Sequence, residues 1–286
     1  MNILNILEEI EKVDGEIYER LSPRRTAMKD FFNFGKKVSM AALPLALGSM
    51  FKKAYGQTNP ASVNDVLGFA LALEYLEYNY YNHALTLANT TYIPVGPARQ
   101  AITTIRNHER AHVDLLKGAL GITGADQYVY ADFDFKAGGV FADVDTNYQT
   151  FLKVATAFED TGVRAYKGQA PILKGMPVLT TALQIHSVEA RHAAHLRQMV
   201  AANVTGASGL KPWIAYTANG NDTGVAAADG VYAGEQNTTQ ATIQITGING
   251  TQVTQSHAAE SFDEFLTGSD VKKIANLFIV PAKRLT

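Results

Sequence analysis

The chain contains no cysteine, and this absence removes several kinds of chemistry at once. Disulfide bonds, thiolate nucleophiles, zinc–thiolate sites and iron–sulfur clusters all require cysteine, so we exclude them. A strong excess of charge of one sign is also lacking, because 25 Lys and Arg residues stand against 27 Asp and Glu residues. Nucleic-acid-binding domains usually carry a basic face. We therefore expect no nucleic-acid partner.

Long apolar runs are scarce, and the clearest one covers residues 38–51. It is too short to span a membrane comfortably. It follows the pair Arg24 and Arg25 and a basic stretch, and small residues stand just before Gln57, an order that is typical of a twin-arginine export signal. We predict that residues 1–56 are a signal and leader for the twin-arginine export machinery, which places the protein in the periplasm or another extracytoplasmic compartment of a bacterium. The alternative is a short membrane-associated helix that stays attached.

Four segments after the leader have the spacing of apolar residues that is typical of helices, namely residues 62–89, 97–119, 146–168 and 176–203. The first pair and the second pair are each joined by a short link, so each pair should form an antiparallel hairpin. A long link, residues 121–145, joins the hairpins. This connectivity predicts an all-α four-helix bundle with one long crossover over residues 57–204.

The composition changes in residues 205–286, where Thr, Gly, Asn and Gln become frequent. The stretch 242–254 alternates apolar and polar residues around an Asn-Gly pair, which predicts a β-hairpin. Residues 270–280 have the pattern of a short helix that ends before Pro281. We predict a mixed C-terminal extension that packs on the bundle. A surface arm that contacts a partner is the alternative.

Two of the predicted helices carry a Glu-x-x-His pair inside an apolar stripe. The stripe of the fourth helix is Ala182, Ile185, Glu189, His192, Leu196 and Met199. The second helix repeats it 80 residues earlier with Ile102, Ile105, Glu109, His112, Leu116 and Ala119. A buried carboxylate or imidazole is costly unless something compensates it. Neither stripe contains Lys or Arg, so an ion pair with a basic residue of the stripe does not supply that compensation.

The first and third helices are related in the same way, with a shift of 85 residues. Glu74 corresponds to Glu159, and Tyr81 corresponds to Tyr166. Each half of the bundle thus supplies Glu-x6-Tyr on one helix and Glu-x-x-His on the next.

Together the two halves predict a carboxylate-bridged dimetal site. Four buried carboxylates would repel one another and take up protons, whereas two divalent ions balance their charge. Such bundles build dimetal sites from two Glu helices and two Glu-x-x-His helices. Glutamate and imidazole suit Fe or Mn, and we favour Fe. The predicted ligands are Glu74, Glu109, His112, Glu159, Glu189 and His192.

Several neighbouring residues have more than one reading. Tyr81 and Tyr166 either orient the ligand carboxylates from a second shell around the metals or are core aromatics. Glu77 lies one turn after Glu74 and is an additional ligand, a carboxylate on the path of entering ions, or the helix's true ligand. Its repeat counterpart is Gly162, so symmetry argues against a ligand role.

Four other polar residues near the motifs have less specific predictions. Asp160 is expected to form a cap or salt bridge. His186 and His195 are expected to lie near the ligands or at the surface. His108 is expected to face away from the stripe into solvent.

The stretches "LEYLEYNYY", "HERAH", "FEDTGVRAY" and "HSVEARHAA" together resemble the ferritin-like superfamily. They look closest to bacterial ferritin-like domain proteins that are also similar to plant desiccation-related proteins. The resemblance covers residues 60–205 and, more loosely, the chain from "AESFDEFL" onward. It implies a ferritin-like bundle and the same six ligands. Most members of this group have no established reaction, so the resemblance implies a fold and a site more than an activity.

Three functions fit these predictions. The one we favour is a redox enzyme whose two metals react with O2 or peroxide, by Fe(II) oxidation, peroxide removal or substrate oxygenation. A metal-storage protein is the second, although the long crossover and the extension favour a small homo-oligomer over a hollow shell. The third is a non-catalytic, metal-stabilised protein of the envelope that protects against stress or binds a partner through the C-terminal extension.

Overall fold

A computed structural model describes residues 61–87, 92–215, 226–250 and 252–286. The predicted export signal, residues 1–56, lies outside the described residues. None of the helices in the described ranges combines the length and the hydropathy that a membrane span needs.

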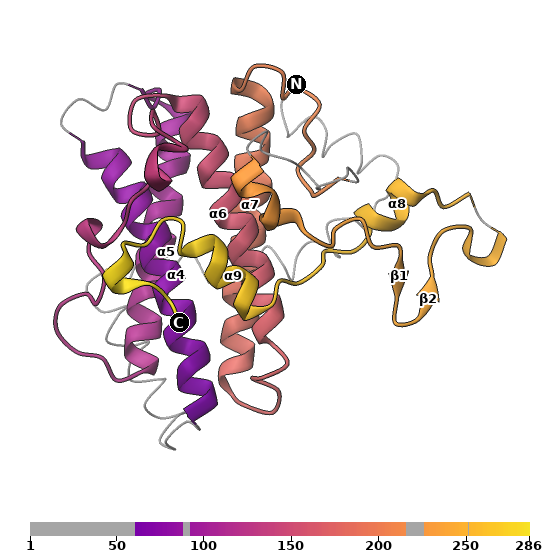
Figure 1. The fold of residues 1–286 in the computed structure, drawn as a ribbon, viewed down its shortest axis with the longest axis horizontal. Helices are drawn as coiled ribbons and strands as arrows, with labels where there is room; N and C mark the ends of the chain where they lie inside the picture. The colour runs from indigo at the N-terminus through magenta and orange to yellow at the C-terminus, as the bar shows by residue number, and fades with distance from the viewer. Residues whose placement is uncertain (1–60, 88–91, 216–225, 251) are drawn as a thin grey trace, which may run out of the picture. The chain divides into compact units, whose positions relative to one another are not determined.

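Four long helices form two antiparallel hairpins, as predicted (Figure 1). Helix α4 (Ala61–Thr86) packs against α5 (Pro97–Ala119), and α6 (Tyr148–Gln169) packs against α7 (Val178–Asn203). Local signals explain two of the starts. Pro97 occupies the first turn of α5, where its missing N–H costs nothing, and the Asn147 side chain accepts a hydrogen bond from the Gln149 amide at the start of α6. The predicted all-α bundle is confirmed.

The crossover between the hairpins packs on the bundle. It contains two short 3-10 helices, η1 (Tyr130–Asp132) and η2 (Ala137–Gly139), and it buries Phe133, Phe135 and Phe141. The ring of Phe135 lies 5.1 Å from that of Tyr80 on α4, between ring centres. These aromatic contacts extend the hydrophobic core beyond the four helices.

Helix α6 is buried on nearly every side. Its residues from Phe151 to Ala165 are almost all inaccessible, whereas α5 buries one stripe. The C-terminal extension explains the difference, because η3 (Ala226–Tyr232) and α9 (Gly268–Ala275) pack against α6. The extension therefore packs on the bundle, as we predicted.

Two details of the extension differ from the sequence prediction. The β-hairpin consists of β1 (Thr239–Gln240) and β2 (Ile243–Gln244), so it begins before the predicted range 242–254 and ends near the start of that range. The Asn-Gly pair falls instead in the 3-10 helix η4 (Ile248–Gly250). A turn does form around this pair, since the Gly247 amide donates to the Val253 carbonyl, but the strands do not continue beyond it.

The predicted helix over residues 270–280 also ends early, at Ala275. The chain beyond it pairs with the crossover: Ile279 forms an antiparallel bridge with Phe133, and the Val280 amide donates to the Asp132 carbonyl. Backbone pairing with a distant segment thus replaces the last helical turn. Two further short helices complete the described extension, α8 (Gln255–Glu260) and η5 (Pro281–Lys283).

Two buried arginines tie the extension to the second hairpin. The guanidinium of Arg164 on α6 lies 2.9 Å from a Glu235 carboxylate oxygen and donates to the carbonyls of Val231, Ala233 and Glu264. Arg197 on α7 pairs with Asp160 at 2.5 Å, and the Tyr232 hydroxyl donates to the same carboxylate. The salt-bridge reading of Asp160 is therefore confirmed.

Candidate metal centre

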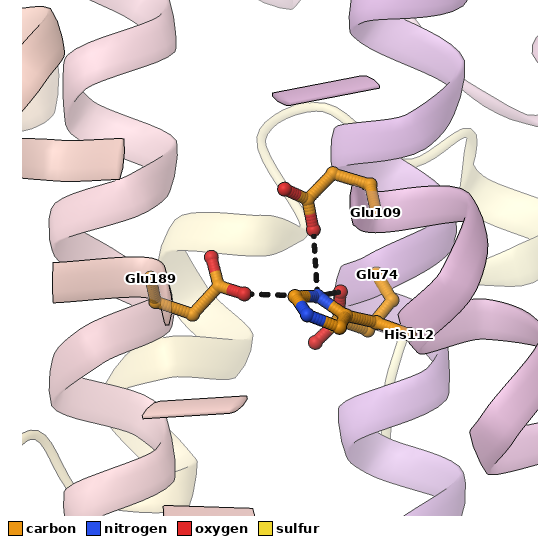
Figure 2. A group of neighbouring side chains, drawn as sticks. All are labelled: Glu74, Glu109, His112 and Glu189. Carbon is orange, nitrogen blue, oxygen red and sulfur yellow. Dashed lines mark hydrogen bonds and ion pairs between the residues drawn. The ribbon is translucent and has the colours of Figure 1, made fainter. Parts of the chain in front are cut away.

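The six residues predicted as ligands come together in the core of the bundle. They form two overlapping groups in which the possible donor atoms lie within 4.8 Å of one another. The first contains Glu74, Glu109, His112 and Glu189 (Figure 2), and the second contains Glu109, Glu159, Glu189 and His192. Glu109 and Glu189 belong to both groups.

The two shared glutamates each direct one oxygen to each group. For Glu109, Oε2 lies 3.1 Å from His112 Nδ1 and Oε1 lies 3.0 Å from His192 Nδ1. For Glu189, Oε1 lies 3.0 Å from His112 Nδ1 and Oε2 lies 3.6 Å from His192 Nδ1. This placement would let each of the two carboxylates hold two neighbouring ions.

The other two glutamates each serve one group. Glu74 Oε2 lies 3.1 Å from His112 Nδ1, and Glu159 Oε2 lies 3.1 Å from His192 Nδ1. Each hairpin thus supplies one Glu and one His that belong to a single group, and the two shared glutamates come from different hairpins. The pseudo-twofold repeat of the sequence is present in the geometry.

The two tyrosines join the halves across the site. Tyr81 on α4 donates from its hydroxyl to Glu159 Oε1 at 2.6 Å, and Tyr166 on α6 donates to Glu74 Oε1 at 2.5 Å. In both glutamates Oε1 accepts the hydrogen bond from the tyrosine, and Oε2 is the oxygen next to the histidine of the same group. Of the two readings left open by the sequence, the contacts support orientation of the carboxylates.

Burial and charge act strongly on these groups. Burial raises the pKa of Glu74 to about 8, and Glu189 and Glu109 add to the rise while His112 opposes it. Burial also raises the pKa of Glu159. For His192, burial opposes the charged form, but Glu159 and the two shared glutamates outweigh it and raise the pKa to about 12. Without a cation, therefore, protons hold the cluster together.

The donor set fits divalent ions. Glu109 Oε1 and both oxygens of Glu189 are buried and accept no hydrogen bond from the described residues. Donors that share one ion at about 2.1 Å lie about 3 Å apart when they are neighbours, which matches the separations between histidine nitrogens and carboxylate oxygens. Four carboxylates and two imidazoles match Fe or Mn better than softer metals. The cluster is thus compatible with a dimetal site, and nothing in it selects Fe over Mn.

Three histidines outside the six differ in their placement. His108 is exposed, as expected, but it does not face away from the site: its Nδ1 lies 2.9 Å from His192 Nε2, and the rings are stacked. That part of the prediction was wrong. Helical spacing gives the direction of the His108 side chain on α5, but it does not show which residues of α7 lie next to that side chain. His186 is half-buried and His195 is exposed, and neither belongs to the two groups.

Glu77 lies beside the cluster without belonging to either group of donors. Its side chain is 3% exposed. Burial raises the pKa of its carboxyl well above the ordinary value, and the nearby carboxylates of Glu159, Glu189, Glu109 and Glu74 add to the rise. A fifth buried glutamate therefore lies beside the four that the repeat predicts.

Comparison with known protein families is consistent with this geometry. Residues 62–202 match the family described as ferritin-like domain. The match begins in α4 and ends in α7, so the matched region contains both hairpins and all six clustered residues. No match was found among curated proteins or among solved structures.

Proposed function

We propose that this ferritin-like domain binds two divalent metal ions, Fe or Mn, and uses them for redox chemistry with O2 or peroxide. The observation that carries the proposal is the pair of shared glutamates, Glu109 and Glu189, each with one oxygen toward each group. A purely structural salt-bridge network would pair these carboxylates with Lys or Arg. Here the two shared carboxylates lie between two equivalent Glu–His pairs instead.

Each residue has a distinct part in this proposal. Glu109 and Glu189 would hold two ions next to each other, and Glu74 with His112, and Glu159 with His192, would hold one ion each. Tyr166 and Tyr81 fix the two terminal carboxylates by donating to their Oε1 atoms. Bound ions would supply the electrons that O2 or peroxide accepts. His108 would fix the orientation of the His192 ring, because its Nδ1 atom is within hydrogen-bond distance of His192 Nε2, on the side of the ring away from the carboxylates.

An apolar cavity next to the cluster favours O2 as the oxidant. It has a volume of about 20 Å³ and is lined by all four helices, including Leu73, Leu116, Tyr166 and Ile185. Tyr166 connects it to the site, because its hydroxyl donates to Glu74. A small apolar cavity stays dry and accepts small apolar molecules, whereas peroxide is strongly hydrated.

The test is the metal content and oxidant use of the purified protein. We expect about two Fe or Mn per chain in the wild type and none in a Glu109→Ala/Glu189→Ala variant, with His195→Ala on the exposed face of α7 as a matched control. Loading with Fe(II) should give O2 consumption that the double variant lacks. A folded wild type that binds no metal would overturn the proposal.

The alternative is a non-catalytic protein in which the metals hold the bundle together. The resemblance to bacterial proteins that are similar to plant desiccation-related proteins supports a role in stress protection, and the exposed Ile243 of the β-hairpin supports a partner or a second copy at the extension. Two bound metals without turnover of O2 or peroxide would favour it.

We also propose export through the twin-arginine machinery on the basis of Arg24 and Arg25. Replacing both with lysine should retain the protein in the cytoplasm of a bacterial host that has this machinery. Unchanged export of that variant would contradict the proposal.

A further inference from the structure

Glu77 is a buried carboxylate that the symmetry of the site does not explain. It lies on α4 one turn after Glu74, and among the described residues it has no hydrogen-bond or ion-pair partner. Burying an unpaired carboxylate costs several kcal/mol, and four neighbouring carboxylates add to that cost. A cation or a proton would compensate it.

The repeat counterpart of Glu77, Gly162 on α6, provides the space for it. A Cβ atom at position 162 would lie 3.2 Å from Glu77 Oε1 and 3.8 Å from Glu189 Oε2. The two repeat-related positions therefore meet at one place between α4 and α6. Only one of them can carry a long side chain, and in this chain it is position 77.

The same distances show which half of the site Glu77 adjoins. Glu189 Oε2, the oxygen beside this space, belongs to the His192 half, whereas Glu189 Oε1 faces His112. Gly162 also lies one turn after Glu159, the terminal glutamate of that half. The fifth carboxylate is thus placed on one side of an otherwise symmetric cluster.

We propose that Glu77 is a fifth carboxylate ligand, which serves the ion held by Glu159 and His192 and makes the two ion positions unequal. This inference rests on the proposed dimetal function. A position with one more carboxylate oxygen binds hard divalent cations such as Mn²⁺ more tightly than its neighbour. Because Gly162 carries no side chain, the Glu77 carboxylate already lies against α6 on the side of this ion.

Titration of the metal-free full chain with Mn²⁺, followed by calorimetry and by the electron paramagnetic resonance of bound Mn²⁺, tests this assignment. We expect two sites of unequal affinity in the wild type. Glu77→Gln should weaken one site by about 10- to 100-fold and leave the other unchanged. Gly162→Ala, whose new Cβ crowds the Glu77 carboxylate, should weaken the same site by a smaller factor.

Gly68→Ala is the matched control, because it makes the same change in α4, where no atom lies within 4 Å of the new Cβ. It should leave both sites unchanged. Thermal unfolding of the metal-free proteins separates binding from folding, since Glu77→Gln keeps the size of the side chain and replaces a buried carboxyl by a neutral amide, and it should not lower the melting temperature.

The outcomes separate this inference from the function on which it rests. Two Mn²⁺ sites with wild-type affinities in Glu77→Gln would overturn the role of Glu77 and leave the dimetal proposal standing. A wild type that binds no Mn²⁺ or Fe²⁺ would overturn both.

Discussion

Removing the guanidinium of Arg164 should detach the C-terminal extension from the bundle. Arg164 is fully buried, and its one guanidinium contacts the Glu235 carboxylate and three backbone carbonyls of the extension. In Arg164→Met, Glu235 would stay in a site where it is 3% exposed but would have lost its cation. Breaking a buried ion pair in this way costs about 3–5 kcal/mol.

That cost is a large fraction of the about 5–15 kcal/mol that stabilises a typical domain. The lost interactions join α6 to the segment 226–235. We therefore expect the extension to separate from the bundle while the two hairpins stay helical. Urea unfolding should then show two transitions in place of one. Circular dichroism reports the helices, and the fluorescence of Trp213, the chain's single tryptophan, reports the segment that follows α7.

A double variant, Arg164→Met/Glu235→Met, is the matched control for the ion pair. Replacing both partners of a buried pair by apolar side chains is often neutral, so the second change should recover much of the loss. An unchanged urea midpoint in Arg164→Met would refute the reasoning, and so would a double variant less stable than either single one.

Three further predictions concern the cluster and its cavity. In the metal-free protein the pKa of Glu74 is about 8 against an ordinary 4.5, so the folded state binds the extra proton. Its unfolding free energy should therefore fall as the pH rises from about 4.5 to 8, and a flat or rising urea midpoint would contradict this. Tyr166→Phe should weaken one Mn²⁺ site about 10- to 100-fold by calorimetry, and Tyr81→Phe should weaken the other; equal loss at both sites in either variant would refute the pairing. Ala182→Phe fills the cavity and should slow O2 consumption more than peroxide consumption at equal metal content; equal slowing would exclude the cavity as the route of O2.

The bundle and the six clustered residues could be predicted because both depend on local periodicity and on an internal repeat. Apolar residues at helical spacing define a buried stripe whatever the rest of the chain does, and Glu109, His112, Glu189 and His192 lie inside such stripes. The start of α5 was also predictable, since Pro97 is a local signal.

Contacts between distant segments could not be predicted in this way. The contact of His108 with His192 depends on how α5 and α7 face each other, and the early end of α9 depends on backbone pairing of Ile279 with Phe133. The short β-hairpin at Thr239–Gln244 has the same origin, because two-residue strands leave almost no pattern in a sequence.

The sequence by itself determined the two helical hairpins and the kinds of side chain in the cluster, because apolar stripes at helical spacing and a repeated Glu-x-x-His inside them are local patterns. Only the tertiary structure decided which carboxylates are shared between the two groups, that each tyrosine binds the glutamate of the other half, and that Glu77 occupies the space left by Gly162. The reason is geometric. A helix determines which side chains share a face, whereas the packing of one helix on another determines which atoms meet.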